Sequence, residues 1–225
     1  MYVFLGMFLA LSTSGRFVLL APLPETLTPD IKDMEVMRSP EFQDNAENAY
    51  SLVTKILMEI PAVHKSLIHI ETLSLNESDL SSLQILKKFL GLPEPSPLQP
   101  LSDKFTLEVS LGRIVEGLKL HKILLKVISE LEHLKVKKPS ELLYDLRDAI
   151  LHIHKMQHLI KAVNGPEKVT ESQLREDLTP KLENEYRSQV ATHLALIQLR
   201  QFTKDVSRSL HSMIISPAEP EGQES

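Results

Sequence analysis

Cysteine and tryptophan are both missing from this chain of 225 residues. Without cysteine the chain forms no disulfide, no thiolate metal site and no thiol nucleophile. Only seven glycines are present and aromatic residues make up 5% of the sequence, whereas 42% of the residues are hydrophobic. Few glycines together with abundant leucine and isoleucine favour helices over a β-sandwich or a barrel. The sequence therefore predicts an all-α protein that depends on its apolar core for stability.

Positive charge is in short supply as well. The chain has 25 Lys and Arg residues against 30 Asp and Glu residues, a net charge of −5, and no basic block. Nucleic-acid binding needs clustered positive charge to neutralise phosphates, so this composition argues against that class of partner. A chain of this length can bury one sizeable core, and we expect a single folded domain.

Long apolar runs are absent except at the start, which reads MYVFLGMFLALSTSG. This run is too short to span a membrane and ends in small polar residues, as signal peptides do. We expect residues 1–21 to form a signal peptide, cleaved between residues 15 and 21, and the protein to be secreted without membrane insertion. A buried N-terminal strand is the alternative, because no Lys or Arg precedes the run.

Three further stretches bear on processing and order. Asn76-Glu77-Ser78 is an acceptor sequon, which predicts glycosylation of Asn76 in a secreted protein. Residues 22–40 contain four prolines and no sustained period, so we expect a flexible N-terminal arm. The polar, acidic residues 216–225 are typical of a disordered tail. Residues 41–215 remain as the folded domain.

Four segments carry apolar residues at steps of three and four, which is the pattern of amphipathic helices. The first stripe consists of Ala46, Tyr50, Val53, Leu57, Ile60, Val63, Leu67 and Ile70. The second follows a predicted cap at Ser102 or Asp103 and consists of Leu107, Leu111, Ile114, Leu118, His121, Leu125 and Ile128. The third follows Pro139-Ser140-Glu141 and consists of Leu142, Leu146, Ala149, Ile153, Met156 and Ile160. The fourth follows a predicted helix start at Thr179-Pro180 and consists of Ala191, Ala195, Leu199, Phe202, Val206, Leu210 and Met213.

Prolines and a glycine mark the first helix and the link that follows it. Pro61 lies inside the first apolar stripe and predicts a kink near residues 57–61 rather than a helix end. Residues 76–90 predict a short helix that Gly91 ends. The next stretch, LPEPSPLQP, contains four prolines, which favour extended backbone.

Link lengths constrain how these helices are connected. A link of about six residues between the second and third helices spans at most roughly 20 Å, so those helices are antiparallel. The links before and after it are long enough to return along a helix of about 42 Å. Two long links around one short link fit a long-chain four-helix bundle with up-up-down-down topology. In this prediction the short extra helix lies in the first long link.

Catalytic motifs are missing too, since the chain has no Gly-rich phosphate loop, no G-x-S-x-G and no H-E-x-x-H. His154 and His158 have the spacing to share a metal, but two surface histidines are the commoner case. We therefore expect no enzyme activity, no cofactor and no metal.

The third helix instead carries a polar strip, at spacings of 3, 4 and 3 residues, on the face opposite its apolar stripe: Asp145, Asp148, His152 and Lys155. An ordinary solvated helix face would show the same spacing.

Three stretches resemble granulocyte colony-stimulating factor and myelomonocytic growth factor, which are interleukin-6-like long-chain helical cytokines. They are LSDKFTLEVSLGRIVEGLKLHKILLKVISEL after the proline-bearing link, LLYDLRDAILHIHKMQ with its paired aspartates, and YRSQVATHLALIQLRQFTKDVSRSL in the last helix. The segment APLPE is also similar to family members. The resemblance extends over residues 46–213.

This resemblance implies a growth factor that is a monomer until it binds and dimerises a class I cytokine receptor, and that stimulates granulocyte-lineage cells. The main receptor surface of the family then corresponds to Lys55, Glu59, Asp145, Asp148, His152 and Lys155. A second receptor surface, on the short helix and the start of the last helix, corresponds to Ser82, Ile85 and Tyr186. The two disulfides typical of the family cannot form here, because the chain has no cysteine.

Two other functions are compatible with the same sequence. Another interleukin-6-type cytokine would share much of this helical pattern. A secreted helical carrier of lipid or another apolar ligand is a less favoured alternative, because helix bundles can enclose such ligands. The histidines at 152 and 154, beside the expected receptor surface, also suggest that acidification weakens receptor binding.

Overall fold

A computed structural model describes residues 31–75, 83–102, 104–130, 139–162 and 169–215 of the chain. Within these ranges there are seven α-helices, one 3₁₀ helix and an isolated bridge between Ser102 and Phe105, but no strand. The prediction of an all-α protein is confirmed for this part of the chain. The predicted signal peptide, the glycosylation site and the C-terminal tail lie outside it.

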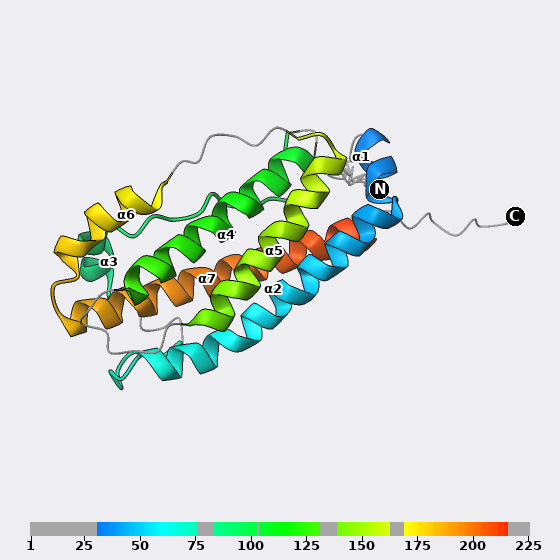
Figure 1. Ribbon diagram of the computed structural model, residues 1–225. Coiled ribbons are helices and arrows are strands. Elements are labelled where there is room, and N and C mark those ends of the chain that lie inside the picture. Colours follow the sequence, from blue (N-terminus) through cyan, green and yellow to red (C-terminus); the bar gives the residue numbers. More distant parts are fainter. Residues whose placement is uncertain (1–30, 76–82, 103, 131–138, 163–168, 216–225) are drawn as a thin grey trace, which may run out of the picture.

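Four long helices surround the apolar core (Figure 1). They are α2 (Pro40–Leu67), α4 (Leu107–Ser129), α5 (Ser140–Leu159) and α7 (Glu185–Ile215). Helix α2 packs against both α5 and α7, and α4 packs against the same two helices. Each of the four long helices therefore contributes one buried face to a shared core.

Helices α2 and α7 run in opposite directions. Near the start of α2, the Gln43 side chain donates a hydrogen bond to the Met213 carbonyl, close to the end of α7. Near the end of α2, a ring nitrogen of His64 lies 2.9 Å from one of His193, in the first half of α7. Buried apolar residues line the length of the contact between these two points.

Helices α2 and α5 are also antiparallel. Asn45, early in α2, contacts His152, in the second half of α5. Lys55, further along α2, contacts Asp145, near the start of α5. Two contacts in this crossed order fix both the direction and the register of the pair.

Part of the expected N-terminal arm is helical. Residues Ile31–Met37 form α1, and Met37 is fully buried. The Asp33 carboxylate accepts a hydrogen bond from the Leu107 backbone N–H, at the first residue of α4. The prediction of a loose arm is therefore wrong for residues 31–37, because these contacts hold a short helix that has no sustained apolar period of its own.

The buried stripe of α2 differs slightly from the predicted one. Ala46, Val53, Ile60 and Leu67 are buried as expected, but Ile56 is fully buried and Leu57 only partly. Both are large aliphatic residues at adjacent positions, so spacing alone did not distinguish them. Helix α2 continues through Pro61 to Leu67, which confirms that this proline does not end it.

Helix α4 starts later than predicted. The hydroxyl of Thr106 accepts a hydrogen bond from the Val109 backbone N–H and caps the helix. Ser102 does not cap it but exchanges backbone hydrogen bonds with Phe105, which is buried. The prediction of Ser102 as the cap is therefore wrong, because burying Phe105 requires a turn before the helix begins. Asp103 lies outside the described residues.

The link between α5 and α7 contains its own helix. A capping box at Thr170 begins α6 (Glu171–Leu178), and a 3₁₀ turn, η2 (Thr179–Lys181), follows. The Thr179 hydroxyl donates to the Arg175 carbonyl and so belongs to the end of α6. The predicted start of the last helix at Thr179-Pro180 is wrong, because the chain turns to bury Leu182 before α7 begins.

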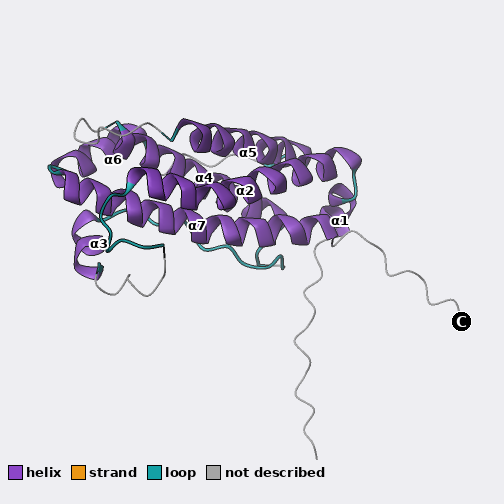
Figure 2. Cartoon of the chain, turned by 90° about the horizontal axis from the view of Figure 1, so that it is seen from below, coloured by secondary structure: helices purple, strands orange, loops and turns teal. Residues whose placement is uncertain are grey.

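The short helix α3 (Gln84–Leu90) ends as predicted at Gly91, whose φ of 62° is in the left-handed region. The proline-rich segment follows, and its Leu92 side chain is buried. Arg113 of α4 donates a hydrogen bond of 2.8 Å to the Pro97 carbonyl, which ties this segment to the helices. Figure 2 shows α3 at one end of the molecule and α1 at the other.

Candidate functional site

Lys55 of α2 is surrounded by acidic side chains. Its Nζ lies 2.8 and 3.1 Å from the two carboxylate oxygens of Asp145. The same Nζ lies 3.4 Å from an oxygen of Glu59 and 3.5 Å from an oxygen of Glu141. We call these four residues the Lys55 cluster. One ammonium faces three carboxylates, so the cluster carries an excess of negative charge.

Burial differs sharply within the Lys55 cluster. The Asp145 side chain is 11% exposed, that of Glu59 is 24% exposed and that of Glu141 is 79% exposed. The hydrogen bond to Asp145 raises the pKa of Lys55 above its ordinary value. Burial, and next the charge of Asp145, raise the pKa of Glu59. Lys55 is therefore held in its charged form, while ionisation of Glu59 is opposed.

The polar strip of α5 is predicted to lie on the face opposite the core. This prediction is wrong, because the strip starts at a buried residue. Asp145 is buried beside α2, and His152 is half-buried with its Nδ1 3.0 Å from the Asn45 carbonyl oxygen. Asp148 is half-buried, and of the four residues only Lys155 is exposed. Position 145 is about 100° around the helix from the buried Leu146, and this rotation turns it toward the neighbouring helix. The strip therefore begins in the contact between α2 and α5.

The outward face of α5 carries residues that the sequence analysis missed. Tyr144 and Leu151 are both exposed. The Arg147 guanidinium lies 5.2 Å from the Tyr144 ring centre and forms an ion pair of 2.9 Å with Asp148. Tyrosine and arginine are enriched in protein interfaces. The signal was available, because two large apolar residues seven positions apart share a helix face.

The second expected surface is partly described. Ile85 of α3 is 83% exposed, and Tyr186, near the start of α7, is also exposed. The Arg187 guanidinium lies 5.0 Å from the ring centre of Phe89, which joins α3 to the start of α7. The structure thus brings the elements of Ile85 and Tyr186 together, and Phe89 is an addition. Ser82 lies outside the described residues.

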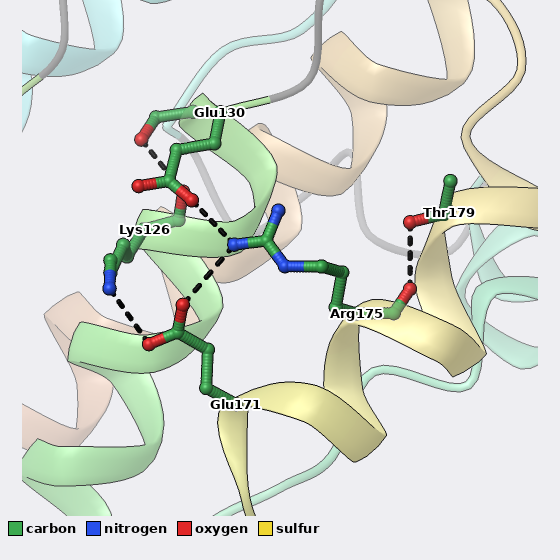
Figure 3. Close-up of polar contacts among 6 residues, drawn as sticks. Lys126, Glu130, Glu171, Arg175 and Thr179 are labelled. Atoms are coloured by element: carbon green, nitrogen blue, oxygen red, sulfur yellow. Dashed lines mark hydrogen bonds and ion pairs between the residues drawn. The ribbon is translucent and has the colours of Figure 1, made fainter.

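A different ion network fastens α6 to α4 (Figure 3). Lys126 Nζ lies 2.8 Å from a Glu171 oxygen, and Arg175 pairs with both Glu130 and Glu171. We call these four residues the α6 network. Its two cations face two carboxylates. The hydrogen bond from Lys126 is the main cause that lowers the pKa of Glu171.

Neither a membrane-spanning helix nor a metal site is found in the described residues. No helix in the described ranges is both long and apolar enough to cross a membrane. Those ranges also hold no group of three or more His, Asp or Glu side chains arranged for a metal ion. His154 contacts Gln157 at 2.8 Å, whereas His158 is exposed. A comparison with known protein families, curated proteins and solved structures finds no match for this chain.

Proposed function

We propose that this protein is a secreted helical cytokine that binds and dimerises a class I cytokine receptor and stimulates granulocyte-lineage cells. The observation that carries the proposal is the Lys55 cluster. It unites Lys55, Glu59 and Asp145, three of the residues that the family resemblance assigns to receptor binding, although Asp145 lies 90 residues after Lys55 in the sequence.

The helix directions support the up-up-down-down four-helix bundle that this proposal requires. Helix α2 is antiparallel to both α5 and α7, as the order of the contacts along its length indicates. The hydrogen bond between Asp33 and Leu107 brings the start of α4 to the segment that precedes α2. In the proposed topology α2 and α4 run one way, and α5 and α7 run the other way.

The charge of the Lys55 cluster favours a basic partner. Three carboxylates around one ammonium leave negative charge that an arginine or lysine of a receptor can neutralise. Opposite charges of this kind speed the association of two proteins. Exposed Met58, next to Glu59 on α2, and exposed Tyr144 on α5 add side chains of the types that interfaces favour.

A second contact is needed for receptor dimerisation, and the surface on α3 and α7 supports it. Ile85, Phe89 and Tyr186 are large exposed side chains on two neighbouring elements. They belong to elements other than α2 and α5, so one cytokine can contact two receptor chains with different surfaces. We further propose that Asn76, in the link before α3, is glycosylated in the secreted protein.

A binding measurement tests the proposal. The mature chain is passed over a panel of class I cytokine receptor ectodomains, and the double variant Glu141→Lys/Asp148→Lys is compared with it. Both side chains are accessible, so we expect affinity to fall by about tenfold or more, mostly through slower association, with unchanged helical circular dichroism.

The matched control is Glu176→Lys, which reverses an exposed charge on α6 and should leave affinity unchanged. Rising salt should slow association of the unchanged chain, because it screens the attraction. Equal binding by the double variant would show that α5 does not form the receptor surface. Failure of the unchanged chain to bind any ectodomain in the panel would remove the cytokine proposal itself.

A further inference from the structure

Asp145 is the least accessible acidic residue of the Lys55 cluster. Its side chain is 11% exposed, against 79% for Glu141, and both of its carboxylate oxygens lie within 3.1 Å of Lys55 Nζ. A carboxylate covered to this extent offers a partner little surface. Its place in the cluster therefore differs from that of the accessible carboxylates around it.

We propose that Lys55 and Asp145 are positioning residues, whose ion pair sets α5 against α2 and thereby places Glu59 and Glu141 for the receptor. This inference rests on the proposed function. It divides the Lys55 cluster into a pair that fixes the helices, Lys55 and Asp145, and two neighbours that contact the partner, Glu59 and Glu141.

The geometry of the pair suits this role. Lys55 Nζ approaches both oxygens of one carboxylate, so the contact restricts rotation as well as distance. A second polar contact, between Asn45 and His152 at 3.0 Å, joins the same two helices ten positions earlier in α2. Ten helical residues correspond to about 15 Å, so the two contacts together oppose both sliding and rotation of α5.

The chemistry also predicts an asymmetry between the partners. If Lys55 is removed, the Asp145 charge stays in a buried place without its cation, which is strongly unfavourable. If Asp145 is removed, the ammonium of Lys55, whose side chain is 45% exposed, keeps Glu59 and Glu141 beside it. Loss of Lys55 should therefore harm the protein more than loss of Asp145.

A mutant cycle tests the positioning role. Its variants are Lys55→Met, Asp145→Leu and the double variant that carries both changes. Asp145 is the buried member of this pair, and replacing a buried charge together with its partner by apolar side chains is often neutral, whereas leaving a buried charge without its partner is costly. We expect Lys55→Met to lower the folding equilibrium constant by roughly 100-fold, Asp145→Leu by less than about tenfold, and the double variant to recover most of the loss.

Receptor affinity provides the second readout, measured at a temperature where all variants are folded. Lys55→Met should bind about tenfold more weakly, because the helices it joins are displaced, and the double variant should return to within about threefold. A double variant that is stable but binds poorly would show direct contact by Lys55 or Asp145 and overturn the inference. So would a folded Lys55→Met variant with unchanged affinity.

The control is the double variant Lys126→Met/Glu171→Leu in the α6 network. This pair has the same separation of 2.8 Å, and Lys126 is 43% exposed against 45% for Lys55. It should alter stability without altering receptor affinity.

If the unchanged chain binds no receptor, the proposed function fails. The unfolding cycle then decides the inference alone, and additive effects of the two single variants would refute it.

Discussion

The Lys55 cluster and the α6 network both join two helices through a lysine 2.8 Å from a carboxylate, but their charges balance differently. In the α6 network, Lys126 and Arg175 face two carboxylates. In the Lys55 cluster, a single cation faces three. A balanced network can hold two elements together with no net charge left over. An unbalanced one holds them and still attracts a cation.

The pKa values of the acidic residues reflect the same difference. Two neighbouring cations lower the pKa of Glu171, with the hydrogen bond from Lys126 as the largest cause. Burial and two nearby carboxylates raise the pKa of Glu59, and the attraction of Lys55 does not offset them. The contrast can be tested with acid and with neutral substitutions, which should act in opposite directions at the two places.

The largest effect of acid on stability should come from a buried histidine in the core, outside both the Lys55 cluster and the α6 network. His121 of α4 is fully buried, its Nδ1 lies 2.7 Å from the Gly117 carbonyl oxygen, and its ring stacks on Phe202. Burial lowers the pKa of His121 to about 4 from 6.5. In the unfolded chain His121 is therefore protonated below about pH 6.5, whereas in the folded chain it is protonated only below about pH 4.

Stability from this group is full above pH 6.5 and is lost as pH falls toward 4, by about 3 kcal/mol. Urea unfolding of the unchanged chain and of His121→Leu at pH 7, 5.5 and 4 measures it. The variant should lose less stability over this interval. If the unchanged chain and the variant lose the same stability between pH 7 and pH 4, groups other than His121 control acid unfolding.

A smaller loss of stability is expected when Glu171, the carboxylate that contacts both cations of the α6 network, is made neutral. Glu171→Gln should lower the free energy of unfolding at pH 7 by about 0.5 kcal/mol, because its side chain is exposed enough for solvent to screen the attraction. The folded pKa of Glu171 is lowered, so its contribution is present above pH 4.5 and disappears as pH falls through the folded value. A difference that persists unchanged at pH 3 would contradict this account.

The smallest change in stability is expected at Glu59, and it should have the opposite sign to that at Glu171. The folded pKa of Glu59 is raised above 4.5, so folding opposes its ionisation at neutral pH. Glu59→Gln should therefore raise the free energy of unfolding at pH 7 by up to about 0.5 kcal/mol. The gain should vanish in acid, where Glu59 is itself neutral. Thermal unfolding of both Gln variants in one buffer series tests the contrast, and a loss at both sites would abolish it.

The buried faces of the later helices could be predicted from the sequence, but several helix ends could not. All seven expected core residues of α7 are buried, because burial repeats every three to four residues whatever the helix packs against. The start of α4 depends instead on Phe105. Its burial requires a turn after Ser102, and Thr106 then becomes the cap.

The candidate site shows a similar limit. The acidic residues of α5 could be identified from spacing and resemblance, but the burial of Asp145 could not. A residue beside the apolar stripe faces either solvent or the next helix, and the angle at which the two helices pack decides which. The sequence places Glu141 only at the helix start, and its position beside Lys55 depends on a residue of α2 that lies 86 positions earlier in the chain.

The contact between His64 and His193 offers a spectroscopic view of the fold. Burial lowers the pKa of His64, so at neutral pH an uncharged ring meets its neighbour at 2.9 Å. One of the two facing nitrogens must donate and the other accept, so a proton on one of them requires that the other carry none. Their ring ¹⁵N resonances therefore form a linked pair, whose joint change in ¹⁵N-enriched protein would report separation of α2 from α7 without any dye or spin label attached to the protein.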